Sequence, residues 1–189
     1  MGHRALVAYR RDADSLDSED AADLNSSDAN SSDTGYDLHR SHWGGADFAL
    51  LDGISAEEPY AADTQFAVDP QPVATDRSLA DAAANHLDFL HHEAFYRVDS
   101  DYEVTAYHVL WFGLEADAEA VERSETVGHG ALVEAHRDDS DYLRGWFRGA
   151  KEVVAEMVDR GALTPAAASD ALAERAETWA DDREVIVPE

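Results

Sequence analysis

The amino-acid sequence predicts an α+β fold in which helices cover a mainly antiparallel sheet. Three patterns indicate this class. Short apolar runs of strand length dominate residues 3–135, one helical stripe starts at Ser78, and two more helical stripes fill the C-terminal part of the chain. We expect a single domain over residues 1–189, because a second hydrophobic core in a chain of this length would be small.

An N-terminal hairpin is the first predicted element. Residues 3–9 (HRALVAY) and 36–43 (YDLHRSHW) both have the composition of strands, and Gly44-Gly45 follows the second as a turn signal. Aspartate and serine dominate residues 11–35, which have almost nothing to bury, so we expect an acidic flexible insertion there. Matching the apolar positions of the two strands places Val7 opposite Leu38 and His3 opposite His42.

The middle of the chain predicts one central helix followed by strands. Ser78 and Asp81 resemble a capping box, and apolar residues recur at helical spacing from there to Leu90. Turn residues at 99–101 then separate two strand-like runs. The predicted strands are 94–98, 103–114 and 131–135, with a further short strand at 63–68.

A C-terminal αα-hairpin is predicted over residues 139–182. Its first helix carries an apolar stripe from Leu143 to Val158 and ends at Gly161. Thr164 and Pro165 form an N-cap with proline at the first helical position, which starts the second helix. We expect the pair to pack on one face of the sheet, because each helix has one apolar side to cover.

The charge of the chain indicates a salty solvent. Aspartate and glutamate total 41 against 14 lysines and arginines, which gives a net charge of -27. Repulsion on that scale destabilises a compact state in dilute salt and is screened in concentrated salt. We therefore expect a halophilic, cytoplasmic protein, since no export signal or membrane-length apolar run is present.

The same charge argues against nucleic acid as a partner, because binding a phosphate backbone needs a basic surface. Arg144, Arg148 and Lys151 share one helix face, and we interpret them as salt partners of neighbouring glutamates and aspartates. The absence of cysteine excludes disulfides, thiolate metal sites and cysteine nucleophiles.

Histidines are the remaining candidates for a metal site. In the predicted register His3 and His42 lie side by side, and either His108 or His129 would supply a third ligand for a divalent metal. This set predicts a small metal-dependent hydrolase as the alternative function. The competing interpretation is structural, because half-buried histidine pairs are common in sheets and no ligand spacing defines this set.

The leading hypothesis is a non-catalytic protein that binds a protein or small-molecule partner. Trp43 stands beside Gly44 and Gly45, where an aromatic anchor meets an accessible backbone, and such anchors are enriched at interaction sites. His39 lies on the same strand face as Trp43 and Asp37. It is interpreted either as a general base or as a partly buried histidine with one hydrogen bond. The predicted binding residues are therefore Trp43, His39 and Gly44.

The two N-terminal strands also carry a resemblance. The runs GHRALVAY, from Gly2, and YDLHRSHWGG, ending at Gly45, are similar to those of a haloarchaeal family of uncharacterised proteins classed as a domain of unknown function. The resemblance implies a salt-adapted origin. It implies no activity, cofactor or partner.

Overall fold

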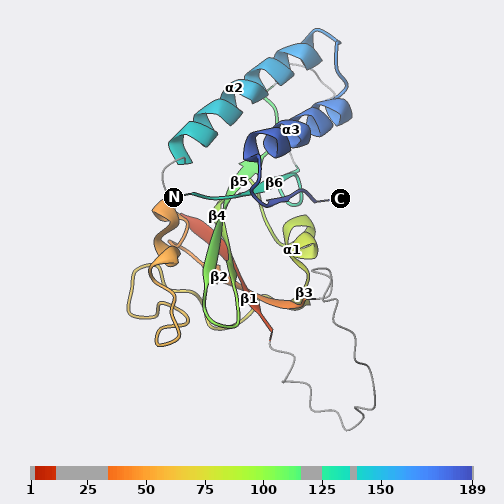
Figure 1. The fold of residues 1–189 in the computed structure, drawn as a ribbon. Helices are drawn as coiled ribbons and strands as arrows, with labels where there is room; N and C mark the ends of the chain where they lie inside the picture. Colours follow the sequence, from red (N-terminus) through yellow and green to blue (C-terminus); the bar gives the residue numbers. More distant parts are fainter. Residues whose placement is uncertain (1–2, 12–33, 116–124, 137–139, 189) are drawn as a thin grey trace, which may run out of the picture.

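The computed structural model describes residues 3–11, 34–115, 125–136 and 140–188. These residues form an α+β fold around a seven-stranded sheet of order β3-β2-β1-β4-β5-β6-β7, in which every neighbouring pair is antiparallel except β1 and β4 (Figure 1). In chain order, the elements are β1 (Arg4–Arg10), β2 (Tyr36–Ser41), the 3₁₀ segment η3 (Ala46–Leu51), β3 (Ala74–Arg77), α1 (Leu79–Asn85), β4 (His92–Val98), β5 (Val104–Trp111), β6 (Gly130–Glu134), α2 (Ser140–Asp159), α3 (Pro165–Ala180) and β7 (Val185–Ile186).

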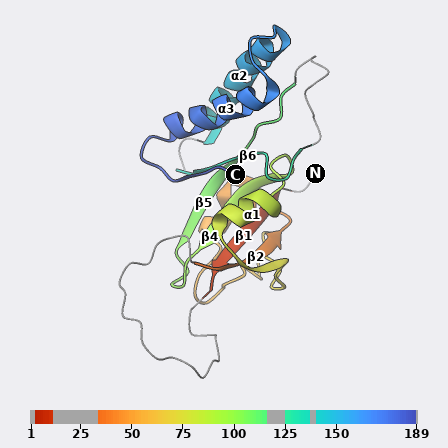
Figure 2. The same cartoon turned by 90° about the vertical axis from the view of Figure 1, so that its right-hand side faces the viewer.

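Both faces of the sheet are covered. On one face, α1 packs its alanines against β1, β2 and the middle of the sheet, with Leu6, Phe95 and Tyr107 at the centre of that cluster. On the other face, η3 and the segment that follows it cover β1 and β4, whereas α2 and α3 cover β5 and β6. Figure 2 shows the two long helices at the β5–β6 end of the sheet. Two core clusters therefore lie side by side on this second face.

The register of β1 and β2 differs from the predicted one by one residue. Val7 lies opposite His39 and Ala8 opposite Leu38, so the prediction that Val7 faces Leu38 and His3 faces His42 is wrong. A register is fixed by the apolar pattern only where one face is buried and the other exposed. Here residues on both faces of β1 are fully buried, so the apolar pattern of this strand fits either register.

The central helix is shorter than predicted. Ser78 does cap it, with its side chain accepting the N–H of Asp81, but α1 ends at Asn85 rather than near Leu90. The following residues leave the helix because Phe89 donates its N–H to the Thr126 carbonyl 2.7 Å away. The prediction missed β3 and β7, and the strand expected at 63–68 is reduced to a single bridge between Val68 and Ser41.

At the C-terminal end, α2 and α3 are joined by a short turn. Gly161 adopts a left-handed conformation with φ of 71°, and the Thr164 side chain accepts the N–H of Ala167 at the start of α3. The rings of Trp146 and Trp179 lie 6.1 Å apart between the two helices. Residues 12–33, most of the predicted acidic insertion, lie outside the described part of the chain.

In the ranges that the structure describes, no helix is both long enough and apolar enough to cross a membrane.

Candidate functional site

The turn after β2, where the sequence predicts a binding site, is held by internal contacts. The Ser41 hydroxyl donates to the Phe66 carbonyl at 2.7 Å and accepts the Gly44 N–H at 2.9 Å. The Tyr96 hydroxyl donates to the Gly44 carbonyl at 2.6 Å. A side chain at Gly44 would meet Leu50 and Ser41 within 2.7 Å. Gly44 therefore has a packing role.

Trp43 projects from this turn with 48% of its surface exposed. Its ring lies 5.9 Å from the ring of His3, and His3 Nδ1 lies 2.7 Å from Glu93 Oε2. His42, the residue predicted beside His3, is an exposed residue of the same turn. The structure thus brings His3 to Trp43 and Glu93.

His39 is a buried residue with a hydrogen bond, which is the second of its two interpretations. Its Nδ1 lies 2.8 Å from the Asp69 carbonyl, and its ring packs 5.1 Å from Tyr9 and 5.5 Å from Tyr60. These rings border a small polar cavity of about 310 Å³ that also contains Arg10 and Asp99, which form an ion pair of 3.9 Å.

His108, the predicted third metal ligand, is 1% exposed and packs edge-on against Phe48, with the ring centres 4.8 Å apart. His129, the alternative third ligand, packs against Phe112 at 5.9 Å instead. In the described segments, no group of three histidines, aspartates or glutamates is arranged to hold a metal ion.

A larger site lies elsewhere, in a groove between α2 and the start of β4. Its volume is about 810 Å³, within the range of small-molecule pockets in general. Phe89, Leu90 and Trp111 line one side, and Arg144, Arg148 and Lys151 of α2 line the other. We call this cavity the α2 groove. Its lining residues come from three separate segments, within residues 89–93, 109–115 and 144–159, so the groove exists only in the folded chain.

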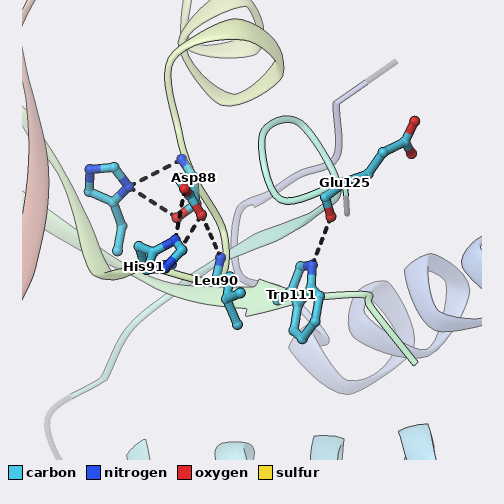
Figure 3. Close-up of polar contacts among 6 residues, drawn as sticks. Asp88, Leu90, His91, Trp111 and Glu125 are labelled. Carbon is cyan, nitrogen blue, oxygen red and sulfur yellow. Dashed lines mark hydrogen bonds and ion pairs between the residues drawn. The ribbon is translucent and has the colours of Figure 1, made fainter. Parts of the chain in front are cut away.

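The wall of the α2 groove near Leu90 is shaped by a turn around Asp88. The Asp88 carboxylate accepts the N–H groups of Leu90 and His91, each at 3.1 Å, and Oδ2 lies 2.9 Å from His91 Nδ1 (Figure 3). Burial alone would raise the pKa of Asp88, but these hydrogen bonds outweigh it and the pKa is lowered. The carboxylate is thus ionised, and it holds the turn that presents Leu90 and His92 to the groove.

His92 lines the groove as a mostly uncharged side chain at neutral pH. Burial is the main cause that lowers its pKa, and its Nδ1 lies 3.1 Å from the Asp88 backbone nitrogen. His92 is the first residue of β4.

Lys151, the only lysine of the chain, lies on the α2 wall of the groove. Its Nζ is 4.6 Å from the centre of the Trp111 ring, a cation–π geometry. Trp111 is fixed in turn, because its indole N–H donates to the Glu125 carbonyl at 3.0 Å (Figure 3). Burial lowers the pKa of Lys151, with Glu115 opposing the shift. The ammonium is therefore partly desolvated, a state in which its interaction with an anion is stronger than in water.

The two arginines of this wall differ from the other cations. Five arginines form ion pairs with carboxylates: Arg10, Arg11, Arg77, Arg97 and Arg160. Among the described residues, by contrast, Arg144 and Arg148 form no ion pair with a carboxylate. No ion pair within the described ranges supports the interpretation of these two arginines as salt partners. The signal that could have revealed the groove was the single lysine, spaced three and seven residues from two arginines on one helix face.

Comparison with known proteins gives a family but no activity. No curated protein matches the chain. No solved structure matches it either. One family model matches residues 61–187, which include every lining residue of the α2 groove and exclude the N-terminal runs that carry the haloarchaeal resemblance. Because this match spans well over half of the sequence, the chain belongs to a family of unknown function, DUF6735.

Proposed function

We propose that this protein binds a small organic anion in the α2 groove and acts as a non-catalytic binding protein. The observation that carries the proposal is the set of cations on one wall. In a chain with 41 acidic residues, Arg144, Arg148 and Lys151 face the same groove without a carboxylate ion pair among the described residues. An anionic ligand would supply the missing partner.

The opposite wall indicates what else the ligand contains. Leu90 and Trp111 offer an apolar surface above the buried Phe89, and Leu90 is exposed enough to contact a ligand directly. Burying apolar area stabilises a complex by about 25 cal/mol per Å² removed from water. The ligand class that fits is therefore a molecule with an apolar or aromatic body and one carboxylate, sulfonate or phosphate group.

The carboxylates of the groove set the position of that group. Five carboxylates line the groove, and an anion placed beside any of them would be repelled: Glu93, Glu115, Glu152, Glu156 and Asp159. The strongest attraction is at Lys151, where desolvation reduces screening. We place the anionic group there, with Arg148 as the second contact from one turn earlier on α2.

A pair of dyes tests this proposal. The probe 1-anilinonaphthalene-8-sulfonate carries an aromatic body and one sulfonate, and N-phenyl-1-naphthylamine has the same body without the charge. We expect the sulfonate probe to bind with a 1:1 stoichiometry, with an affinity at least about tenfold above that of the neutral probe, since one charge-assisted contact contributes about 1.5–3 kcal/mol. Fluorescence titration in concentrated KCl measures both affinities.

Matched variants locate the site. Lys151→Gln removes the charge and keeps most of the side-chain length, and we expect it to weaken the sulfonate probe about tenfold while leaving the neutral probe unchanged. Arg175→Gln, on the exposed side of α3, is the control and should change neither affinity. Equal binding of the two dyes, or equal binding of the sulfonate by wild type and Lys151→Gln, would overturn the proposal.

Two earlier hypotheses stand beside this one as proposals. Trp43 remains a proposed anchor for a partner, and it lies close to the groove because His3 links it to the groove residue Glu93. The acidic excess remains a proposed adaptation to concentrated salt, which urea denaturation at low and high KCl would test. Higher stability in dilute buffer than in molar KCl would refute it.

A further inference from the structure

Lys151 brings the only ε-amine of the chain into the α2 groove. The sequence has 14 lysines and arginines, and this residue is the one lysine among them. Its half-buried side chain lines the groove and, within the described ranges, forms no ion pair with a carboxylate. Arginine stays protonated in proteins, whereas the ε-amine of lysine can lose a proton and act as a nucleophile. Chemistry that arginine cannot perform is therefore available at this one position of the groove.

The surroundings of the Lys151 Nζ atom favour the uncharged amine more than water does. Nζ lies 4.6 Å from the centre of the Trp111 ring, and Leu90 belongs to the same lining. Burial lowers the pKa of Lys151, with the Glu115 carboxylate opposing the shift. A larger fraction of this amine is therefore deprotonated at neutral pH than of a lysine in water. Lysines activated by desolvation form Schiff bases with carbonyl compounds.

Two titratable groups interact electrostatically with this amine. Glu115 shares the lining of the groove, and His129 immediately precedes β6. Burial lowers the pKa of His129, with Glu125 opposing the shift, so the imidazole is mostly uncharged at neutral pH. A carboxylate or a neutral imidazole accepts a proton from an amine and returns it to a leaving group. Groups for the proton transfers that accompany addition of an amine to a carbonyl are thus present beside Lys151.

The arginines of the same wall define what else the carbonyl compound carries. Arg148 precedes Lys151 by three residues and Arg144 precedes it by seven, which correspond to about 4.5 Å and about 10.5 Å along the helix axis. Neither guanidinium forms an ion pair with a carboxylate in the segments that the structure describes. A guanidinium binds a carboxylate, sulfonate or phosphate through parallel hydrogen bonds. A compound that reacts with Lys151 can therefore place an acidic group about one helical turn away, at Arg148.

We propose that Lys151 is a reversible covalent attachment site for an aldehyde or ketone that also carries an acidic group, with Arg148 as the partner of that group. This inference rests on the proposed anion site of the α2 groove and names its ligand class. The deprotonated Nζ attacks the carbonyl carbon, and a C=N bond forms as the carbonyl oxygen leaves. Of the three protons of the original ammonium, two leave with that oxygen as water and one stays on the nitrogen. The resulting iminium keeps the positive charge beside Trp111, and its hydrolysis returns the amine and the ligand unchanged.

Reductive trapping compares Lys151 with a matched lysine in the same protein. Arg175→Lys adds a second lysine on the exposed side of α3, so both amines meet one aldehyde in one sample. The probe is 4-formylbenzenesulfonate with sodium cyanoborohydride at neutral pH in concentrated KCl, and peptide mass spectrometry measures labelling at each position. We expect Lys151 to be labelled at least about tenfold faster than the introduced lysine, because one charge-assisted contact is worth about that factor. Equal rates at the two positions would overturn the proposal.

A neutral aldehyde separates the acidic group from the amine. The probe 4-methylbenzaldehyde has the same ring and carbonyl without the sulfonate. Arg148→Gln should slow labelling of Lys151 by the sulfonate aldehyde about tenfold and leave labelling by the neutral aldehyde unchanged. Equal slowing of both probes, or of neither, would overturn the assignment of the acidic group to Arg148.

The dye titrations distinguish failure of this inference from failure of the proposed function. Neither dye contains a carbonyl, so the two dyes report on the anion site alone. If the sulfonate dye binds as expected and Lys151 is labelled no faster than the lysine introduced at position 175, only the covalent attachment is refuted. If the sulfonate dye binds no better than the neutral dye and Lys151 shows no preference in labelling, both proposals are refuted.

Discussion

Substitution by alanine should lower the free energy of unfolding at Gly45 and raise it at Gly145. Gly45 has φ of -76° and ψ of -16°, which any residue adopts, so its backbone conformation does not require glycine. Its Cβ atom, however, would lie 2.6 Å from the Arg4 carbonyl oxygen and 3.0 Å from that of His3. Both atoms belong to the backbone at the start of β1 and have no side-chain rotation by which to give way.

The magnitudes follow from these contacts. Overpacking of this kind costs about 1–3 kcal/mol, and the reduced entropy of the unfolded chain offsets about 0.4–1 kcal/mol of it. Gly45→Ala should therefore lower the free energy of unfolding by about 1–2 kcal/mol. Gly145→Ala meets no atom within 4 Å and should raise it by about 0.5–1 kcal/mol.

Urea denaturation followed by tryptophan fluorescence measures both values. Thermal melting should agree, with about 2–4 °C of change in Tm per kcal/mol for a chain of this size. If Gly45→Ala is as stable as wild type, the contact between the turn and β1 is looser than the structure shows. The reasoning would then be wrong for Gly44 as well.

Two further predictions concern buried polar groups. Ser41→Ala removes the hydrogen bond from the Gly44 N–H and the one to the Phe66 carbonyl, and should lower the free energy of unfolding by about 1–3 kcal/mol. The control Ser55→Ala loses a single exposed hydrogen bond and should lower it by less than about 1 kcal/mol. Equal effects of the two substitutions in urea denaturation would contradict the structural role of Ser41. Burial is the main cause that raises the pKa values of Tyr9, Tyr96 and Tyr107. Above pH of about 10 the unfolded chain therefore loses phenol protons that the folded chain keeps. The free energy of unfolding should then fall by up to about 4 kcal/mol per pH unit, since each of the three tyrosines contributes about 1.4 kcal/mol. Equal urea midpoints at pH of about 9 and about 11 would refute this.

The limits of the sequence are clearest at α1. Its start could be predicted, because Ser78 and Asp81 interact within one turn of helix. Its end could not be predicted from local pattern, since apolar residues continue at helical spacing as far as Leu90. The helix stops at Asn85 because Phe89 pairs with Thr126, a residue 37 positions further along the chain. Local propensity cannot include a hydrogen bond to so distant a partner.

The candidate site shows the same limit in another form. His39 and Trp43 were predicted from one strand and its turn, and the structure gives His39 a hydrogen bond and Trp43 a neighbour in His3. The α2 groove could not be predicted, because it needs β4, β5 and α2 in place at once. Its cations can be recognised as a helix face from the sequence, but only the structure shows that they form no ion pair with a carboxylate in the part of the chain that it describes.

The sequence by itself determined the α+β class, the acidic composition, the two C-terminal helices and the caps that begin α1 and α3, because each depends on residue type or on contacts within a few positions. The tertiary structure alone decided the register of β1 and β2, the end of α1, the parallel pairing of β1 with β4, and the groove beside Lys151. These features depend on contacts between distant segments. Because both faces of β1 are apolar and buried, the same pattern of residues is compatible with more than one strand register.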